Sequence, residues 1–411
     1  MKKLLSNLFK EHTDRTVCIT ILLFTVIQLA VTSFFGYTPY PDSEGYLFLA
    51  HESMSWYEPY PVHGLLHDYP FLWNIGTVNL TLFSLKIFGS VAPLLFLYSL
   101  LKGATAGLFY LVTKHLFNGR IASIALVLYM LYPANYGEST SLLSELPFMF
   151  LTFLALYCAL CRRWLLVAGL IMGVANWVRP LTFIFLVSLV SYLYLKNKEK
   201  PFAYRCRTAL MPLGGFLIMI LFIGTLTMSR TGLFLYQAKS GWMALADYST
   251  DHSPASMEIR DRADWDVVQK DSAWQSLFFD WLKEHPVEYV AQMPKKLALT
   301  YVSDNVNMCA FMLNKRNPDH LYQRISMPVL AKDFPRWSAI QWLTVLNLLI
   351  YYSLLLTAIA CLLKSKKGIF LPVCIIAVGT LMLLLVGHGE ARFHQPLMPF
   401  IIMLAARIIK I

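Results

Sequence analysis

The chain alternates between long apolar runs and short polar connections. A transmembrane helix needs about 20 predominantly apolar residues, and shorter runs can serve where helices pack together. About ten runs meet this pattern: residues 17–36, 91–113, 121–133, 142–161, 164–178, 181–195, 208–229, 339–363, 369–387 and 397–409. The pattern predicts an all-α polytopic membrane protein with about 10 transmembrane helices.

The connections between these runs differ in charge in a regular way. The basic connections, such as 196–207 and 364–367, fall on one side of the predicted membrane when the crossings are counted from the first helix. The positive-inside rule assigns that side to the cytoplasm. The basic start MKKLLSNLFK precedes an apolar run longer than the core of a signal peptide, so we expect an uncleaved first helix with its N-terminus inside.

The chain divides into three parts. Residues 1–229 form an N-terminal transmembrane module whose first outer loop, 37–81, contains no Lys or Arg. Its aromatic residues predict an interfacial helix near 46–60, and the interrupted apolar segment 70–88 is expected to lie flat or dip into the membrane. Residues 230–338 are too polar to span and rich in Trp, which predicts a small, mostly helical outer domain. Residues 339–411 supply the C-terminal transmembrane helices.

Composition limits the class of protein. Hydrophobic residues make up 57% of the 411 residues and charged residues 14%, which excludes an ordinary soluble globule. The net charge of +11 comes from short basic clusters without interleaved exposed aromatics, so no nucleic acid partner is expected. The seven cysteines suggest neither a disulfide framework nor a zinc site. We expect no cofactor, and a divalent metal at the histidines of the first outer loop is the less favoured alternative.

Two acidic residues follow the first helix. Asp42 and Glu44 lie in YPDSEGYLFLA, where the chain leaves the membrane. Carboxylates at the edge of a low-dielectric layer often serve as general bases. The alternative is that they cap the next helix, since Asp or Ser before an apolar run is a common helix start.

Three other outer stretches contain ionisable residues. NWVRP contributes Arg179, and GHGEARFHQPLMP contributes His388, Glu390, Arg392 and His394. Ionisable groups at the hydrocarbon edge often mark a substrate path. For Arg179 the alternative is a residue that extends from the helix end to the interface, and for Glu390 and Arg392 it is a local ion pair.

The third outer stretch, SELPF, contains Glu145, and the segment before it contains Glu138. We interpret both as packing or capping residues. Lys102, within a predicted span, is expected to reach the interface or to pair with a neighbouring side chain.

The order of these motifs resembles that of a known family. An acidic motif before YLFLA, then LSELPF, a glycine-containing helix ending in RP, EHPVEYVAQMPKKL and a late EARFHQPLMP are similar to the GT-C superfamily of membrane glycosyltransferases. The likeness is strongest to its protein O-mannosyltransferase-like and lipid A aminoarabinose transferase-like branch. The resemblance implies that Asp42 is the catalytic base, with Glu44 as the other candidate, and that Arg392 contacts the donor phosphate.

The expected function is therefore transfer of a sugar from a polyprenyl-phosphate donor to an acceptor hydroxyl on a glycan, lipid or protein, with inversion. The protein would lie in a bacterial plasma membrane with its site on the outer side. A polysaccharide polymerase or ligase is one alternative, but it would place its key Arg and His in the late outer loop. A lipid-sugar transporter is another, and it would place polar groups near the bilayer midplane on broken helices.

Overall fold

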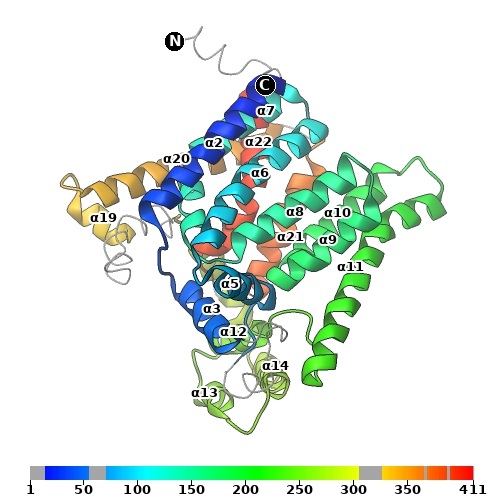
Figure 1. Ribbon diagram of the computed structural model, residues 1–411, viewed down its shortest axis with the longest axis vertical. Helices are drawn as coiled ribbons and strands as arrows, with labels where there is room; N and C mark the ends of the chain where they lie inside the picture. Colours follow the sequence, from blue (N-terminus) through cyan, green and yellow to red (C-terminus); the bar gives the residue numbers. More distant parts are fainter. Residues whose placement is uncertain (1–13, 55–70, 305–325, 365–367, 387–388, 411) are drawn as a thin grey trace.

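The computed structural model describes residues 14–54, 71–304, 326–364, 368–386 and 389–410 (Figure 1). Within these ranges every regular element is an α-helix or a 3-10 helix, and the β pairing is one isolated bridge between Leu72 and Lys239. The predicted all-α class is confirmed.

Among the described residues, four helices are long and apolar enough to cross a membrane: α2 (Asp14–Phe35), α6 (Ala92–Leu116), α11 (Phe202–Thr231) and α20 (Ala339–Lys364). The segment of η1 (Pro133–Tyr136) and η2 (Glu138–Thr140) passes the same test together with α8 (Glu145–Leu160) and counts as a fifth span when the two halves, which meet at a bend of 112°, are taken as one. The chain is therefore a membrane-spanning protein by the length and composition of its helices.

The other apolar helices are shorter than a full span. They are α5 (Ile75–Phe88), α7 (Gly119–Leu131), α9 (Leu165–Val178), α10 (Thr182–Lys196), α21 (Phe370–Val386) and α22 (Met398–Lys410). Nearly every predicted apolar run forms a helix, but the arrangement of about 10 crossings stays a prediction. Figure 1 shows that α2 begins and α22 ends at the same end of the molecule.

Close helix packing fixes α9, whose end holds Arg179. Gly169 and Gly215 face each other across α9 and α11, and a Cβ at Gly169 would overlap the carbonyl oxygen of Pro212. Small residues at such an interface let the two backbones approach, as is common between membrane helices. On the other side of α11, Leu217, Leu221 and other large apolar side chains are exposed, as lipid-facing residues would be.

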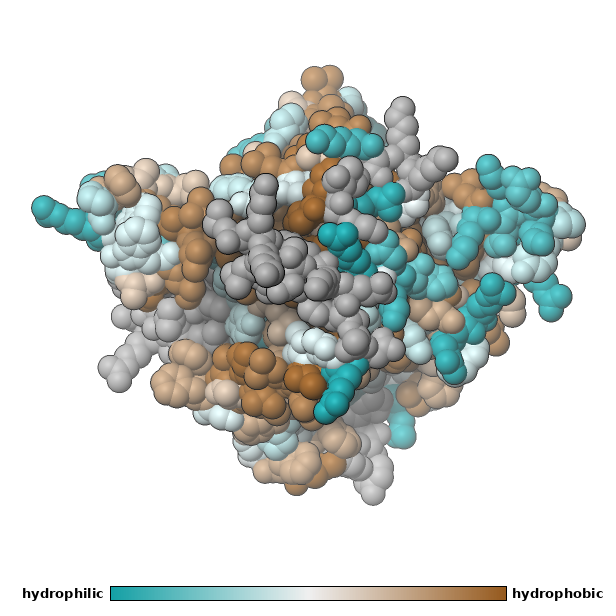
Figure 2. Space-filling model, turned by 90° about the horizontal axis from the view of Figure 1, so that it is seen from above, coloured by the Kyte–Doolittle hydropathy of each residue, from teal (hydrophilic) through white to brown (hydrophobic). Residues whose placement is uncertain are grey.

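The surface in Figure 2, seen from the end where α22 terminates, is mostly hydrophobic along its flanks. Hydrophilic side chains gather at one edge, on the side where Figure 1 places the connection between α10 and α11. Lys198, Glu199 and Lys200 in that connection are exposed. This is the basic connection that the sequence assigns to the cytoplasm.

The opposite end is made by α3 (Pro41–Glu52) and by α12 (Gly241–Ser249), α13 (Pro254–Asp261) and α14 (Val267–Glu284) of the polar region (Figure 1). The polar region also contains α15 (Pro286–Ala291), α16 (Met293–Tyr301) and α19 (Met327–Asp333), and Figure 1 places α19 at the side of the molecule, near α20. Trp274 is fully buried in a small core with Phe278 and Leu245. The region is thus mostly helical in the residues described, as predicted.

The first outer loop differs in detail from the prediction. Its helix α3 begins at Pro41, several residues before the expected start near residue 46. The aromatic residues Trp56, Tyr57 and Tyr60 lie outside the described residues. The segment expected to lie flat or dip in contains a regular helix, α5, that packs against α3 through a shared apolar cluster.

Candidate functional site

A pocket of about 290 Å³ brings together three of the residues that the sequence proposes, Asp42, Arg179 and Arg392. We call it the Asp42 pocket. The rest of the wall includes Tyr46 from α3 and Trp73 from the segment that precedes α5. It also includes Met243 and Tyr248 from α12, and Phe393, which follows Arg392. Charged groups therefore meet an aromatic and apolar wall in this pocket.

The start of α3 places Asp42. Tyr40 occupies the N-cap position in an extended conformation, and Pro41 supplies a first helical residue with a preset φ. No side chain caps this helix end, so Asp42 does not act as its cap. Instead its Oδ2 lies 2.9 Å from Nη2 of Arg392.

Arg392 lies in the 3-10 helix η3 (Ala391–Leu397) and contacts carboxylates from three parts of the chain. Besides Asp42, its Nε lies 3.5 Å from Glu145 and 3.9 Å from Glu390. The distance to Glu390, the neighbour in sequence, is therefore the longest of the three. This argues against the alternative that Arg392 serves only in a local ion pair with Glu390. Its guanidinium also lies 5.0 Å from the ring centre of Tyr40.

The electrostatics of Arg392 follow from these neighbours. Burial opposes its charge, but Glu145, Asp42 and the other negative groups outweigh that effect and raise its pKa well above the usual value. Arg392 is therefore a permanent positive charge. Its Nη1 is buried and has no hydrogen-bond partner among the described residues, so the guanidinium has donor capacity left for another anion.

Arg179 is the C-cap residue of α9 and is 7% exposed. Its Nη1 lies 3.0 Å from Glu145 Oε1 and donates a hydrogen bond of 2.7 Å to Ser144. Its Nε is buried without a hydrogen-bond partner in the described part of the chain. Arg179 thus turns inward to a carboxylate and does not extend to the interface.

Glu145 joins the two arginines, because its Oε1 contacts both guanidinium groups. It is 3% exposed, so its charge depends on these partners. Sequence reasoning interpreted it as a packing or capping residue and so missed this role. The signal was present, since a carboxylate at the start of a strongly apolar helix must find a positive partner.

The second acidic residue of the first loop has a different environment. Glu44 accepts a hydrogen bond of 2.5 Å from the Tyr37 hydroxyl. Burial, and then this hydrogen bond to Glu44, raise the pKa of Tyr37. No ion pair joins Glu44 to Arg179 or Arg392 within the described ranges, so the geometry separates Glu44 from the guanidinium cluster.

His394 is fully buried outside the Asp42 pocket. Its Nδ1 lies 2.6 Å from the Thr300 carbonyl oxygen and its Nε2 lies 3.5 Å from Asp304. Tyr132 and Asn347 also donate hydrogen bonds to Asp304, so this cluster joins η3 to α16, α7 and α20. His388, the remaining candidate, lies outside the described residues.

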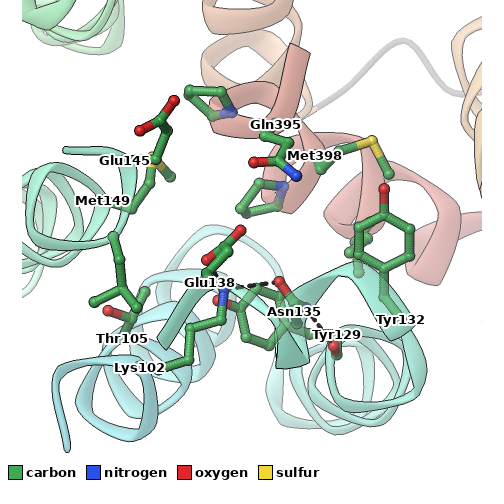
Figure 3. Close-up of a pocket in the computed structure, with 14 residues that line it drawn as sticks. Lys102, Thr105, Tyr129, Tyr132, Asn135, Glu138, Glu145, Met149, Gln395 and Met398 are labelled. Carbon is green, nitrogen blue, oxygen red and sulfur yellow. Dashed lines mark hydrogen bonds and ion pairs between the residues drawn. The ribbon is translucent and has the colours of Figure 1, made fainter. Parts of the chain in front are cut away.

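A second, smaller pocket lies deeper between α6, η2 and α8 (Figure 3). Its volume of about 20 Å³ suits roughly a single water molecule. Lys102 pairs with Glu138 and donates a hydrogen bond of 2.8 Å to Asn135, as Figure 3 shows. The expectation that Lys102 pairs with a neighbour is confirmed. Glu145 lines this pocket and contacts both arginines of the Asp42 pocket, so it connects the two sites.

The part of the chain that is described contains no group of three or more His, Cys, Asp or Glu side chains that could hold a metal ion. A scan of the chain against protein-family models and a search of curated proteins gave no match. The function must therefore be argued from the chemistry of the site.

Proposed function

We propose that the chain is a glycosyltransferase that takes a sugar from a polyprenyl-phosphate donor and transfers it to an acceptor hydroxyl on the outer face of the membrane. The observation that carries the proposal is the pairing of Asp42 with Arg392 in one pocket, close to a second arginine. One carboxylate can accept a proton, and two guanidinium groups can neutralise a departing phosphate.

The arginines are suited to the donor phosphate. A guanidinium can hold a phosphate with two parallel hydrogen bonds, and Nη1 of Arg392 is available for one of them. Glu145 holds both guanidinium groups through a single oxygen atom, which keeps them near each other. A buried phosphate between them would gain negative charge as the glycosidic bond breaks, and the stabilisation would therefore be larger in the transition state.

The donor would also free the base. In the structure Oδ2 of Asp42 lies 2.9 Å from Nη2 of Arg392, so the guanidinium occupies this carboxylate oxygen. A donor phosphate that binds Arg392 would compete with Asp42 for the same hydrogen-bond donors. Asp42 would then be released to accept the acceptor's hydroxyl proton, while the hydroxyl oxygen attacks the anomeric carbon and the polyprenyl phosphate leaves. A single displacement of this kind inverts the anomeric centre.

The apolar part of the pocket suits a lipid-linked donor. Trp73, Met243 and Phe393 line it beside the charged groups. A polyprenyl chain would remain in the bilayer while its sugar phosphate reaches the outer helix ends.

The experiment that tests the proposal incubates the purified protein with a panel of polyprenyl-phosphate sugars and with glycan, lipid and protein acceptors, and measures the release of free polyprenyl phosphate. We expect release with at least one donor and loss of release in Asp42→Asn. If no donor in the panel is consumed by a folded preparation, the transferase proposal is wrong.

A second candidate function is transport of a lipid-linked sugar. The observations that favour it are the 112° bend before α8 and the buried Lys102–Glu138 pair beside that bend, because transporters place polar groups on broken helices. In vesicles, a transporter would move a labelled lipid-linked sugar between leaflets without cleaving it, and Lys102→Met would abolish this movement. A transferase would consume the donor instead.

A further inference from the structure

A second large cleft lies on the outer end of the molecule and has no part in the proposal above. Its volume is about 580 Å³, within the range typical of small-molecule sites. It is formed by the end of α12, by α14, by α15 and α16, and by Gly389. We call it the Lys296 cleft.

Lys296 is the unusual residue of this cleft. It lines the cleft wall, is 5% exposed, and its Nζ has no hydrogen-bond partner among the residues that the structure describes. Its ammonium group lies over the ring of Tyr289, at 5.1 Å from the ring centre. Burial lowers the pKa of Lys296. An ammonium group kept out of water without an anionic partner destabilises the protein unless a ligand supplies that partner.

The other side chains of the cleft suit a carbohydrate. Glu288, Asp251 and Gln292 offer groups that can hydrogen-bond to sugar hydroxyls, and Trp281 offers an aromatic surface. No ion pair joins Lys296 to Asp251 or Glu288 in the described ranges. The cleft therefore combines polar and aromatic groups for a sugar with one buried cation that lacks an anion.

The cleft adjoins the Asp42 pocket. Tyr248 lines both of them. Gly389 packs directly on the backbone of Lys296, where a Cβ would lie 2.9 Å from its carbonyl oxygen, and its φ of +76° favours glycine. Glu390 and Arg392 follow within three residues, so a ligand in the cleft lies beside the segment that holds the donor-binding arginine.

We propose that the Lys296 cleft binds the acceptor of the transfer reaction and that this acceptor is an acidic sugar, whose phosphate or carboxylate pairs with Lys296. The assignment of an acceptor rests on the proposed transferase function. The binding of an acidic sugar by itself does not, and it can be measured without a donor.

The test is a saturation-transfer NMR titration of the purified protein in phosphatidylcholine nanodiscs. The probes are glucose 1-phosphate, glucuronate and uncharged glucose. We expect saturable binding of at least one charged probe, with an affinity at least about tenfold above that of glucose, because a hydrogen bond to a charged group contributes this much.

The decisive variant is Lys296→Met, which keeps the length of the side chain and removes its charge. We expect it to lower the affinity for the charged probe by about tenfold or more. Without ligand it should unfold at the same temperature as the wild type or higher, because an unpaired buried charge is removed. Lys283→Met is the matched control, since Lys283 is exposed on α14, pairs with Asp280 and does not line the cleft.

Unchanged binding in Lys296→Met, or loss of binding in Lys283→Met to the same extent, would overturn the proposal. Competition by phosphatidylglycerol added to the nanodisc would assign the cleft to a lipid headgroup and would also overturn it. Absence of saturable binding by both charged probes would do the same. None of these results depends on donor turnover, so they are distinct from a failure of the transferase proposal.

Discussion

Glu145 provides a sharp test of how the site is held together, because its charge is shared by two arginines. We consider Glu145→Gln, which is nearly isosteric and removes the charge. Oε1 lies 3.0 Å from Arg179 and 3.5 Å from Arg392, and all three side chains are less than a tenth exposed. Removing one partner of a buried ion pair typically costs about 3–5 kcal/mol, since the remaining charges are left uncompensated.

The measurement is equilibrium unfolding in mixed dodecylmaltoside and SDS micelles. We expect the free energy of unfolding of Glu145→Gln to be about 3–5 kcal/mol lower than that of the wild type. The matched control is Glu258→Gln, whose side chain is 76% exposed and lies 4.0 Å from Arg262. An exposed helical pair of this kind contributes about 0.3–0.5 kcal/mol.

A double-mutant cycle separates the pairing from general damage. Arg179→Met should cost less in the Glu145→Gln background than in the wild type, with a coupling energy of about 0.5–3 kcal/mol. Additive effects of the two substitutions, or a Glu145→Gln variant as stable as its Glu258→Gln control, would refute the reasoning.

Three further predictions follow from the same contacts. Arg392→Lys should lower turnover although it conserves charge, because an ammonium cannot form two parallel hydrogen bonds to a phosphate; normal donor turnover in this variant would contradict the role. His394→Gln and Asp304→Asn should each lower stability by about 1–3 kcal/mol, because each disturbs the hydrogen bonds of a fully buried cluster, and the folded fraction should bind donor normally; a stable variant with weakened donor binding would contradict this. A cysteine at Lys283 should react with an impermeant thiol reagent from outside while one at Lys198 should not, and the reverse labelling would break the predicted topology.

Much of the helical architecture could be predicted from the sequence. The long apolar runs predicted the positions of the helices, because the polar backbone of a segment inside lipid must satisfy its own hydrogen bonds. The polar connections between the runs predicted where the helices end. The number of crossings depends on how the shorter helices pack as well as on hydropathy. Helices such as α9 and α10 have 14 and 15 residues, shorter than a full span, and hydropathy alone cannot say whether they cross at an angle or stop within the protein.

The site was predicted in part. Asp42, Arg179 and Arg392 were recognised because charges at the hydrocarbon edge need a reason, and the structure brings them together. The choice between Asp42 and Glu44 could not be made, since it depends on where α3 begins. Two residues that are two positions apart on a helix are rotated by about 200° around its axis and so point to nearly opposite sides. Once the helix starts at Pro41, only one of the pair can therefore face Arg392.

Glu145 and Lys296 show what a sequence pattern leaves out. Glu145 lies at the start of an apolar helix and so matches a capping pattern. Lys296 lies next to exposed Lys295, and such a basic pair fits a solvated face or a contact with an anionic acceptor or lipid headgroups. Their burial, and the presence or absence of a partner, depend on segments distant in the chain. Only the tertiary structure shows that one charge is shared between two arginines and that the other has no hydrogen-bond partner among the described residues.

The central claim is that Asp42 is the general base of a sugar transfer. The direct measurement is the rate of polyprenyl phosphate release by Asp42→Asn and Glu44→Gln, on preparations matched for folding and with a donor that the wild type consumes. The account predicts a loss of about 10²–10⁴-fold in Asp42→Asn and a much smaller effect in Glu44→Gln. Near-normal release by Asp42→Asn would contradict it, and normal release by both variants would exclude this loop from catalysis.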